Sequence, residues 1–170
     1  QTKKVGHTGT IDPLATGILI ICVGKYTKLV DELTSSEKEY VATMKLGIKT
    51  DTGDITGNII EEKESTISKK EIELAFQKFP KEYTQTVPLY SAVKVNGKKL
   101  YEYARKNIKV EVEPRQIEIY SIELSDINKT EQTISFKVKC SKGTYIRSLC
   151  EDIAEKLGTV GYMKAVSYTH

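Results

Sequence analysis

Hydrophobic and polar residues alternate along several stretches of the chain, as expected for strands that bury one face. Every second residue is apolar over residues 39–46 and again over residues 134–140, which predicts two such strands. Residues 117–124 predict a further strand with a phase slip near Tyr120, as a β-bulge would produce. The apolar run over residues 18–22 predicts a fully buried strand.

Two stretches show helical spacing instead. Apolar residues predict one helix that begins after Ser68, where Glu71 completes a capping box, and ends before Pro80. The same spacing predicts a second helix over residues 146–157, with Gly158 suited to its C-terminal stop.

The Asn96-Gly97 pair lies between alternating residues and predicts a tight hairpin, and a short helical stretch is expected over residues 100–105. Strands outnumber helices and do not alternate with them regularly. We therefore predict an α+β fold with a mainly antiparallel or mixed sheet flanked by helices.

Composition adds a broad class to this fold. A chain of 170 residues with 39% hydrophobic residues suits one soluble, cytoplasmic domain. No apolar run approaches the roughly 18 residues of a membrane span. The three cysteines, Cys22, Cys140 and Cys150, lack paired metal-binding spacing, so reduced thiols are expected rather than a zinc site.

Charge is distributed unevenly although the net charge is only +3. Residues 75–109 contain eight Lys or Arg residues but two Glu residues. A segment of this kind suits contact with a polyanion such as RNA. A lysine-rich face that contacts only solvent explains the same charge equally well.

The strongest candidate for chemistry is Asp12, which lies among turn-forming residues that include Gly6, Gly9 and Pro13. Such a loop restricts the direction of the carboxylate, although an aspartate that merely forms a turn is the simpler reading. Arg147, in the first turn of the second predicted helix, is expected to have an anionic partner there. A neighbouring guanidinium would keep a carboxylate ionised, as a nucleophile requires.

Other candidates are ambiguous when each is taken alone. His7 is suited to binding phosphate or a base, or to holding a loop. Tyr40 and Tyr145 are suited to stacking on a planar ligand or to packing within the fold. The sequence contains neither a phosphate-binding P-loop motif nor a dinucleotide-binding glycine motif.

A family resemblance resolves some of this ambiguity. Residues 6–17, GHTGTIDPLATG, resemble the catalytic loop of the TruB family of tRNA pseudouridine-55 synthases. The resemblance continues in the family's order through five further motifs, which are EY at 39–40, KTDTGD at 49–54, VPLYSAVKVNGK at 87–98, LYEYAR at 100–105 and CSKGTYIRSL at 140–149.

The resemblance implies the pseudouridine-synthase fold and a role for each matched position. Asp12 is implied as the nucleophile, paired with Arg147, and Tyr40 as the residue that stacks on the target base. His7, Tyr145, Val166 and Lys94 are implied in substrate binding, with Val166 where the family usually has a Leu that touches the base. Residues 87–105 are implied to form a mobile RNA-contacting arm.

Two departures from the family pattern affect this expectation. The family usually has an additional strand region before the loop and a C-terminal extension, so residues 1–170 are expected to form a catalytic domain that lacks both. Residues 161–170 also lack the usual Leu-Leu-Arg-Thr pattern, and Tyr168 stands where Arg is common.

The resemblance implies isomerisation of uridine to pseudouridine at position 55 in the T-loop of tRNA, after the base is flipped out. No cofactor or metal is expected, and the T-arm stem-loop of tRNA is the expected partner of a monomeric protein. Two alternatives stay open at this stage. One is a guide-RNA-dependent pseudouridine synthase, and the other is a module that binds or folds RNA without catalysis.

Overall fold

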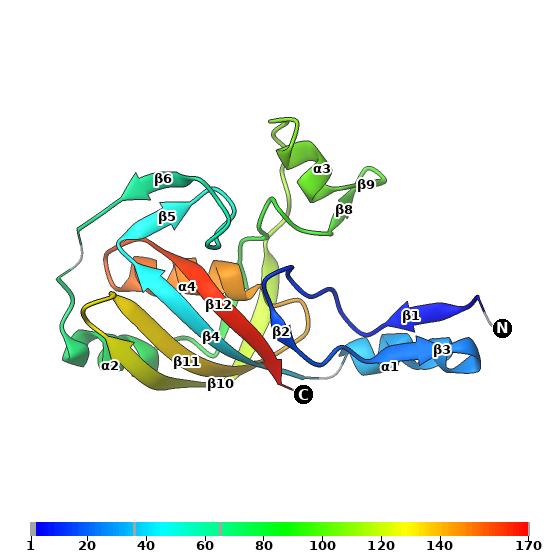
Figure 1. Ribbon diagram of the computed structural model, residues 1–170, viewed down its shortest axis with the longest axis horizontal. Helices are drawn as coiled ribbons and strands as arrows, with labels where there is room; N and C mark the ends of the chain where they lie inside the picture. Colours follow the sequence, from blue (N-terminus) through cyan, green and yellow to red (C-terminus); the bar gives the residue numbers. More distant parts are fainter. Residues whose placement is uncertain (1–2, 36, 65, 170) are drawn as a thin grey trace.

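A six-stranded sheet forms the centre of the protein, which we describe from a computed structural model over residues 3–35, 37–64 and 66–169. The strand order is β2-β12-β4-β11-β10-β7 (Figure 1). Only the β2–β12 pair is parallel among these strands. The bounds are β2 (Thr16–Gly17), β4 (Lys38–Leu46), β7 (Glu82–Gln85), β10 (Arg115–Asn128), β11 (Thr133–Cys140) and β12 (Gly161–Thr169). The predicted α+β class with a mixed sheet is confirmed.

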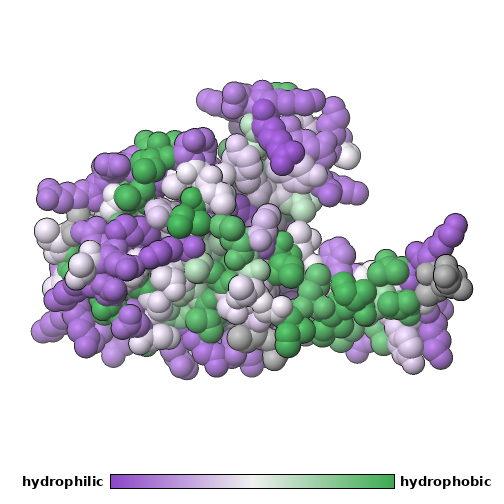
Figure 2. Space-filling model, viewed as in Figure 1, coloured by the Kyte–Doolittle hydropathy of each residue, from purple (hydrophilic) through white to green (hydrophobic). Residues whose placement is uncertain are grey.

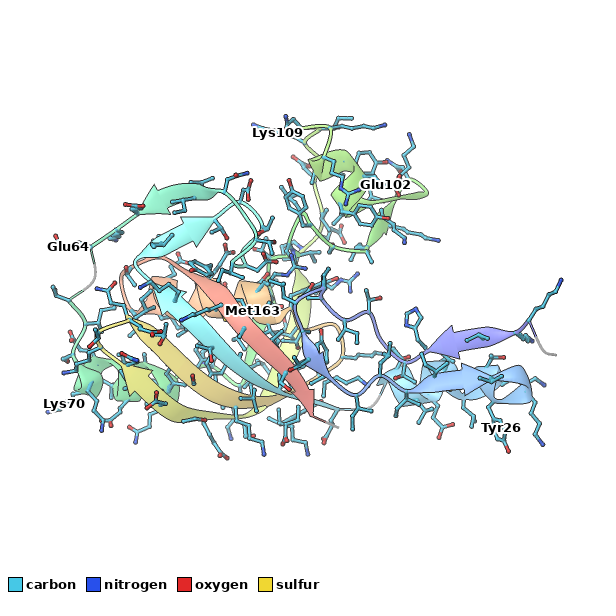
Figure 3. The ribbon with its side chains drawn as sticks, viewed as in Figure 1. Tyr26, Glu64, Lys70, Glu102, Lys109 and Met163 are labelled. Atoms are coloured by element: carbon cyan, nitrogen blue, oxygen red, sulfur yellow. The ribbon has the colours of Figure 1, made fainter. Side chains whose placement is uncertain are left out.

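The core lies between one face of this sheet and two helices, α2 (Lys69–Gln77) and α4 (Ile146–Lys156). The period-two pattern sends alternate residues of each strand into this layer. On β4 and β11 the buried apolar residues are Tyr40, Ala42, Met44, Leu46, Ile134, Phe136, Val138 and Cys140, as the sequence predicted. Met163 of β12, labelled in Figure 3, belongs to the same core.

The local start and stop signals also act as predicted. The Ser68 hydroxyl accepts a hydrogen bond from the Glu71 N–H, and the Glu71 carboxylate accepts one from the Ser68 N–H at the start of α2. Gly158 follows α4 with a φ of +73°. The β10–β11 register moves from Ile119 opposite Cys140 to Ser121 opposite Lys139, so Tyr120 is the extra residue of the expected bulge.

A small arm projects from the sheet between β7 and β10 (Figure 1). It contains β8 (Lys94–Val95), β9 (Lys98–Lys99) and α3 (Leu100–Ala104). Its tight turn has positive φ angles at Asn96 (+50°) and Gly97 (+79°), which confirms the hairpin that the Asn-Gly pair predicted. Glu102 and Lys109 mark this arm in Figure 3.

The N-terminal segment contradicts one prediction. It contains β1 (Val5–His7), β3 (Ile21–Val23), the 3-10 helix η1 (Gly24–Leu29) and α1 (Val30–Ser35), and it extends away from the sheet (Figure 1). The prediction of a buried strand over residues 18–22 is wrong. The strand observed there is β3, which begins only at Ile21. Ile18 is 66% exposed and Ile21 is 51% exposed. β3 pairs with β1 in a two-stranded antiparallel sheet, and Figure 2 shows the resulting apolar surface.

The remaining hairpin, β5 (Ile48–Thr50) and β6 (Ile59–Glu62), lies beside β12. The three cysteines carry free thiols. Across the described ranges, every helix is too short or too polar to cross a lipid bilayer.

Candidate active site

The carboxylate of Asp12 and the guanidinium of Arg147 meet in an ion pair, although the two residues are 135 positions apart in the sequence. Arg147 Nη2 lies 3.0 Å from Asp12 Oδ1. The arginine side chain is 6% exposed and the aspartate side chain is 28% exposed. The carboxylate is therefore held from the protein side and still reaches solvent, as a group that acts on a bound substrate must.

The loop that carries Asp12 is fixed at both ends. Before Asp12, the Thr8 N–H donates to the Ile20 carbonyl at 3.2 Å, and after it the Ala15 N–H donates to the Asp12 carbonyl at 2.9 Å. The loop then continues into β2, which pairs with the end of β12. Gly17 in β2 has a φ of +123°, which L residues rarely adopt. These constraints keep the carboxylate near one position.

Arg147 is held by backbone as well as by Asp12. Its Nη1 donates to the Thr52 carbonyl at 3.1 Å, and its Nη2 also donates to the Tyr90 carbonyl at 2.9 Å. A buried cation requires such acceptors, because it has lost its water. The guanidinium thereby joins three segments, which are the loop of Asp12, the turn after β5 and the start of the arm.

The sequence did not reveal the residues that hold Arg147. Thr52 supplies a backbone carbonyl acceptor, and Asp54 Oδ2 lies 4.0 Å from Arg147 Nε. The other Asp54 oxygen accepts from the Thr52 hydroxyl and from the Thr56 N–H, each at 2.9 Å. The only available signal was the KTDTGD motif in the family resemblance.

Two tyrosines lie beside this ion pair. Tyr40 of β4 is directly opposite Tyr168 of β12, and their rings meet edge to face with centroids 4.9 Å apart. The backbone of Asp12 faces the Tyr168 hydroxyl as a hydrogen-bond donor and lowers the pKa of this phenol. Burial raises the pKa of both phenols, and the negative charge of Asp12 raises them further, so both rings stay neutral at physiological pH.

Val166 lies next to these rings. It is opposite Ala42 on the strand pair that carries Tyr168 and Tyr40, and it is 5% exposed. Since residues two apart on a strand share a face, Val166 adjoins the tyrosine pair on the helix side of the sheet. Tyr145 is half-buried at the N-cap of α4, two residues before Arg147.

The structure does not bring every predicted site residue into this cluster. His7 is exposed on β1 of the N-terminal segment, and Lys94 is exposed on β8 of the arm. The two segments leave the sheet in different directions (Figure 1). Within the described residues, no three His, Cys, Asp or Glu side chains gather as a metal ion would require.

Solved structures with this architecture define the class of the fold. The chain superposes on a Cbf5-Nop10-Gar1 complex with a TM-score of 0.71 and 30% identity, covering 99% of this chain and 40% of the other chain. It also matches an H/ACA RNP bound to a substrate RNA containing 2′-deoxyuridine, with a TM-score of 0.69, 25% identity, and coverage of 99% and 39%. The protein has the pseudouridine-synthase fold.

Sequence comparison defines the family. Residues 1–146 match the TruB family pseudouridylate synthase (N terminal domain), and the chain belongs to this family. It is 48% identical to tRNA pseudouridine synthase B of Oceanobacillus iheyensis, over 99% of this chain and 56% of that protein. It is 52% identical to the protein of the same name from Clostridium tetani, over 93% and 54%. The chain thus spans about half the length of these relatives.

Proposed function

We propose that this protein isomerises uridine to pseudouridine at position 55 in the T-loop of tRNA, with Asp12 as the nucleophile. The observation that carries the proposal is the Asp12–Arg147 ion pair at 3.0 Å, on a loop fixed by hydrogen bonds at both ends. The names of the relatives, tRNA pseudouridine synthase B, support tRNA as the substrate.

The main chemical requirement of the reaction is an ionised carboxylate at a fixed position. The N1–C1′ bond breaks, the uracil turns, and C5 bonds to C1′, after which C5 loses a proton and N1 gains one. Asp12 acts as an anion in this sequence, attacking C1′ or C6 or removing a proton. Arg147 orients this anion and stabilises its charge, because the guanidinium is buried and itself fixed.

The substrate must expose a single base to reach Asp12. A flipped nucleotide loses its stacking at a cost of a few kcal/mol, which contacts in the protein offset. Tyr40 offers an aromatic ring beside Asp12, and Tyr145 and Val166 complete the apolar surroundings of a uracil. We place His7 and Lys94 on the N-terminal segment and the arm, where they contact the RNA that flanks the target nucleotide.

Residues 1–170 act in this proposal as a catalytic domain, with residues 87–105 as the mobile arm that closes on RNA. The Lys and Arg residues between 75 and 109 favour such a contact. We further propose that the protein is a cytoplasmic monomer.

Guide-RNA-dependent modification is the second candidate, because solved relatives include an H/ACA RNP with its substrate RNA. The curated relatives favour modification without a guide, since their names specify a tRNA synthase and their identity to this chain is higher.

The test is incubation of the chain with an isolated T-arm stem-loop, without guide RNA, followed by mass mapping of pseudouridine. The wild-type chain should convert position 55, and Asp12→Ala and Asp12→Asn should not, while both variants still bind the RNA. Conversion that requires a guide RNA would favour the second candidate. A wild-type chain that binds and refolds the RNA without forming pseudouridine would show a non-catalytic module.

A further inference from the structure

Gln85, the last residue of β7, is a buried polar side chain outside the ion pair, and it is 1% exposed. Both ends of its amide are bonded. Nε2 donates to the Tyr83 hydroxyl oxygen at 3.0 Å, and Oε1 accepts from the Tyr145 N–H at 2.8 Å. The Tyr83 hydroxyl in turn donates to Asp152 Oδ2 on α4 at 2.7 Å.

The direction of this chain of hydrogen bonds follows from its last member. An ionised carboxylate only accepts hydrogen bonds, so the single O–H of Tyr83 donates to Asp152. The phenol oxygen is then available only as an acceptor, and it faces the NH₂ end of Gln85. The carbonyl end of Gln85 is left to face the Tyr145 N–H, so the amide has one orientation.

The bond to Tyr145 lies where the site is assembled. Tyr145 is the N-cap of α4 and has no side-chain cap of its own. Two neighbouring hydrogen bonds join the same turn of α4 to the segment after β7, since the Ser148 hydroxyl donates to the Thr86 carbonyl and Arg147 Nη2 donates to the Tyr90 carbonyl, each at 2.9 Å.

We propose that Gln85 is a positioning residue, which holds the backbone of Tyr145 and thereby sets the first turn of α4 so that Arg147 meets Asp12. The inference rests on the proposed function, because its effect is read in catalysis. Gln85 itself touches neither Asp12 nor the guanidinium. Gln85 acts through the N-terminus of α4. A buried amide whose donor and acceptor are both hydrogen-bonded makes the backbone there more rigid.

The charges around this network make an isosteric test possible. Burial raises the pKa of Asp152, hydrogen bonds from Tyr83 and Gln85 lower it, Glu155 raises it and Lys156 lowers it. Tyr83 also faces Cys140. A protonated Glu at position 85 would reproduce both hydrogen bonds of the amide, whereas an ionised Glu would add a second anion beside Asp152.

The first test compares Gln85→Met with Thr84→Val in the proposed T-arm assay. Thr84 is the matched control, because it is the adjacent residue of β7 and its hydroxyl donates to Gln116 Oε1 at 3.0 Å, away from α4. Gln85→Met should lower kcat about tenfold to a hundredfold with KM changed less than about twofold, as loss of a buried hydrogen bond implies. Thr84→Val should leave both constants unchanged, with folding of each variant checked by circular dichroism.

The second test is Gln85→Glu across pH. Its kcat relative to wild type should rise as pH falls from about 8 to about 6, because protonation restores the donor. Amide hydrogen exchange at Tyr145 gives a reading independent of activity, and it should accelerate about tenfold or more in Gln85→Met but not in Thr84→Val. Wild-type kcat in a folded Gln85→Met protein, or unchanged exchange at Tyr145, overturns the inference. An inactive wild-type chain refutes the proposed function instead, and the exchange rate then decides the positioning role.

Discussion

Replacement of Arg147 by Lys tests how the carboxylate of Asp12 is held. The guanidinium donates to Asp12 Oδ1, to the Tyr90 carbonyl and to the Thr52 carbonyl at 2.9–3.1 Å. These acceptors lie around a planar group, so a single ammonium keeps the charge but cannot reach all of them.

The expected cost follows from these contacts. A hydrogen bond to a charged group contributes about 1.5–3 kcal/mol. Arg147→Lys loses at least one such bond and leaves a part-buried carbonyl without its donor. The Asp12 side chain is 28% exposed, so water compensates part of the loss at that end. We therefore expect the free energy of unfolding to fall by about 2–3 kcal/mol. A nucleophile displaced by about 1 Å should lower kcat about a hundredfold.

A double-mutant cycle separates the contribution of the Asp12–Arg147 ion pair from that of the hydrogen bonds between Arg147 and the backbone. Urea unfolding of wild type, Asp12→Asn, Arg147→Lys and the double variant should give a coupling energy of about 1 kcal/mol. Arg115→Lys serves as the control, because Arg115 is exposed at the start of β10, and it should change stability by less than about 0.5 kcal/mol. Additive effects of Asp12→Asn and Arg147→Lys, or a wild-type kcat in Arg147→Lys, would refute the reasoning.

Three further substitutions test the surroundings of the site. Gly17→Ala should lower the free energy of unfolding by about 2–4 kcal/mol in urea, because φ is +123° and the methyl group would clash with the Tyr168 carbonyl; a loss below about 0.5 kcal/mol contradicts this. Ser148→Ala should cost about 1 kcal/mol in the same assay, since the Thr86 carbonyl loses its donor; unchanged stability would show that water replaces the hydroxyl. Burial raises the pKa of Asp152 above its ordinary 3.8, so the folded state binds a proton more tightly than the unfolded state. Wild-type stability should therefore fall as pH rises from 3.8 through the raised pKa of the folded state. Asp152→Asn should remove this slope from urea midpoints, and an identical slope in the variant would contradict the assignment.

The parts of the fold that follow local rules were predictable from the sequence. The alternation over residues 39–46 and 134–140 requires only that one side of each strand meet the core, and both strands do so. The Asn96-Gly97 turn is similar, because positive φ is a property of those two residues. The exposure of Ile18, Ile20 and Ile21 was not predictable in this way. Burial of an apolar strand depends on a second layer, and within the described residues β3 pairs with β1 alone, in a two-stranded sheet that extends from the central one.

In the candidate site, the side-chain partners could be predicted from the sequence and the backbone partners could not. Asp12 and Arg147 could be proposed as partners because a carboxylate and a guanidinium are distinctive side chains, and the structure joins them. The carbonyls of Thr52 and Tyr90 could not, because every residue has a carbonyl and its use depends on where the chain runs. Gln85 is intermediate, since its side chain is distinctive but its partner is the backbone of Tyr145. Backbone groups thus supply much of the geometry that holds Arg147 in place. Substitutions that keep the local backbone at positions 52 and 90 should therefore disturb Arg147 less than loss of the Gln85 amide does.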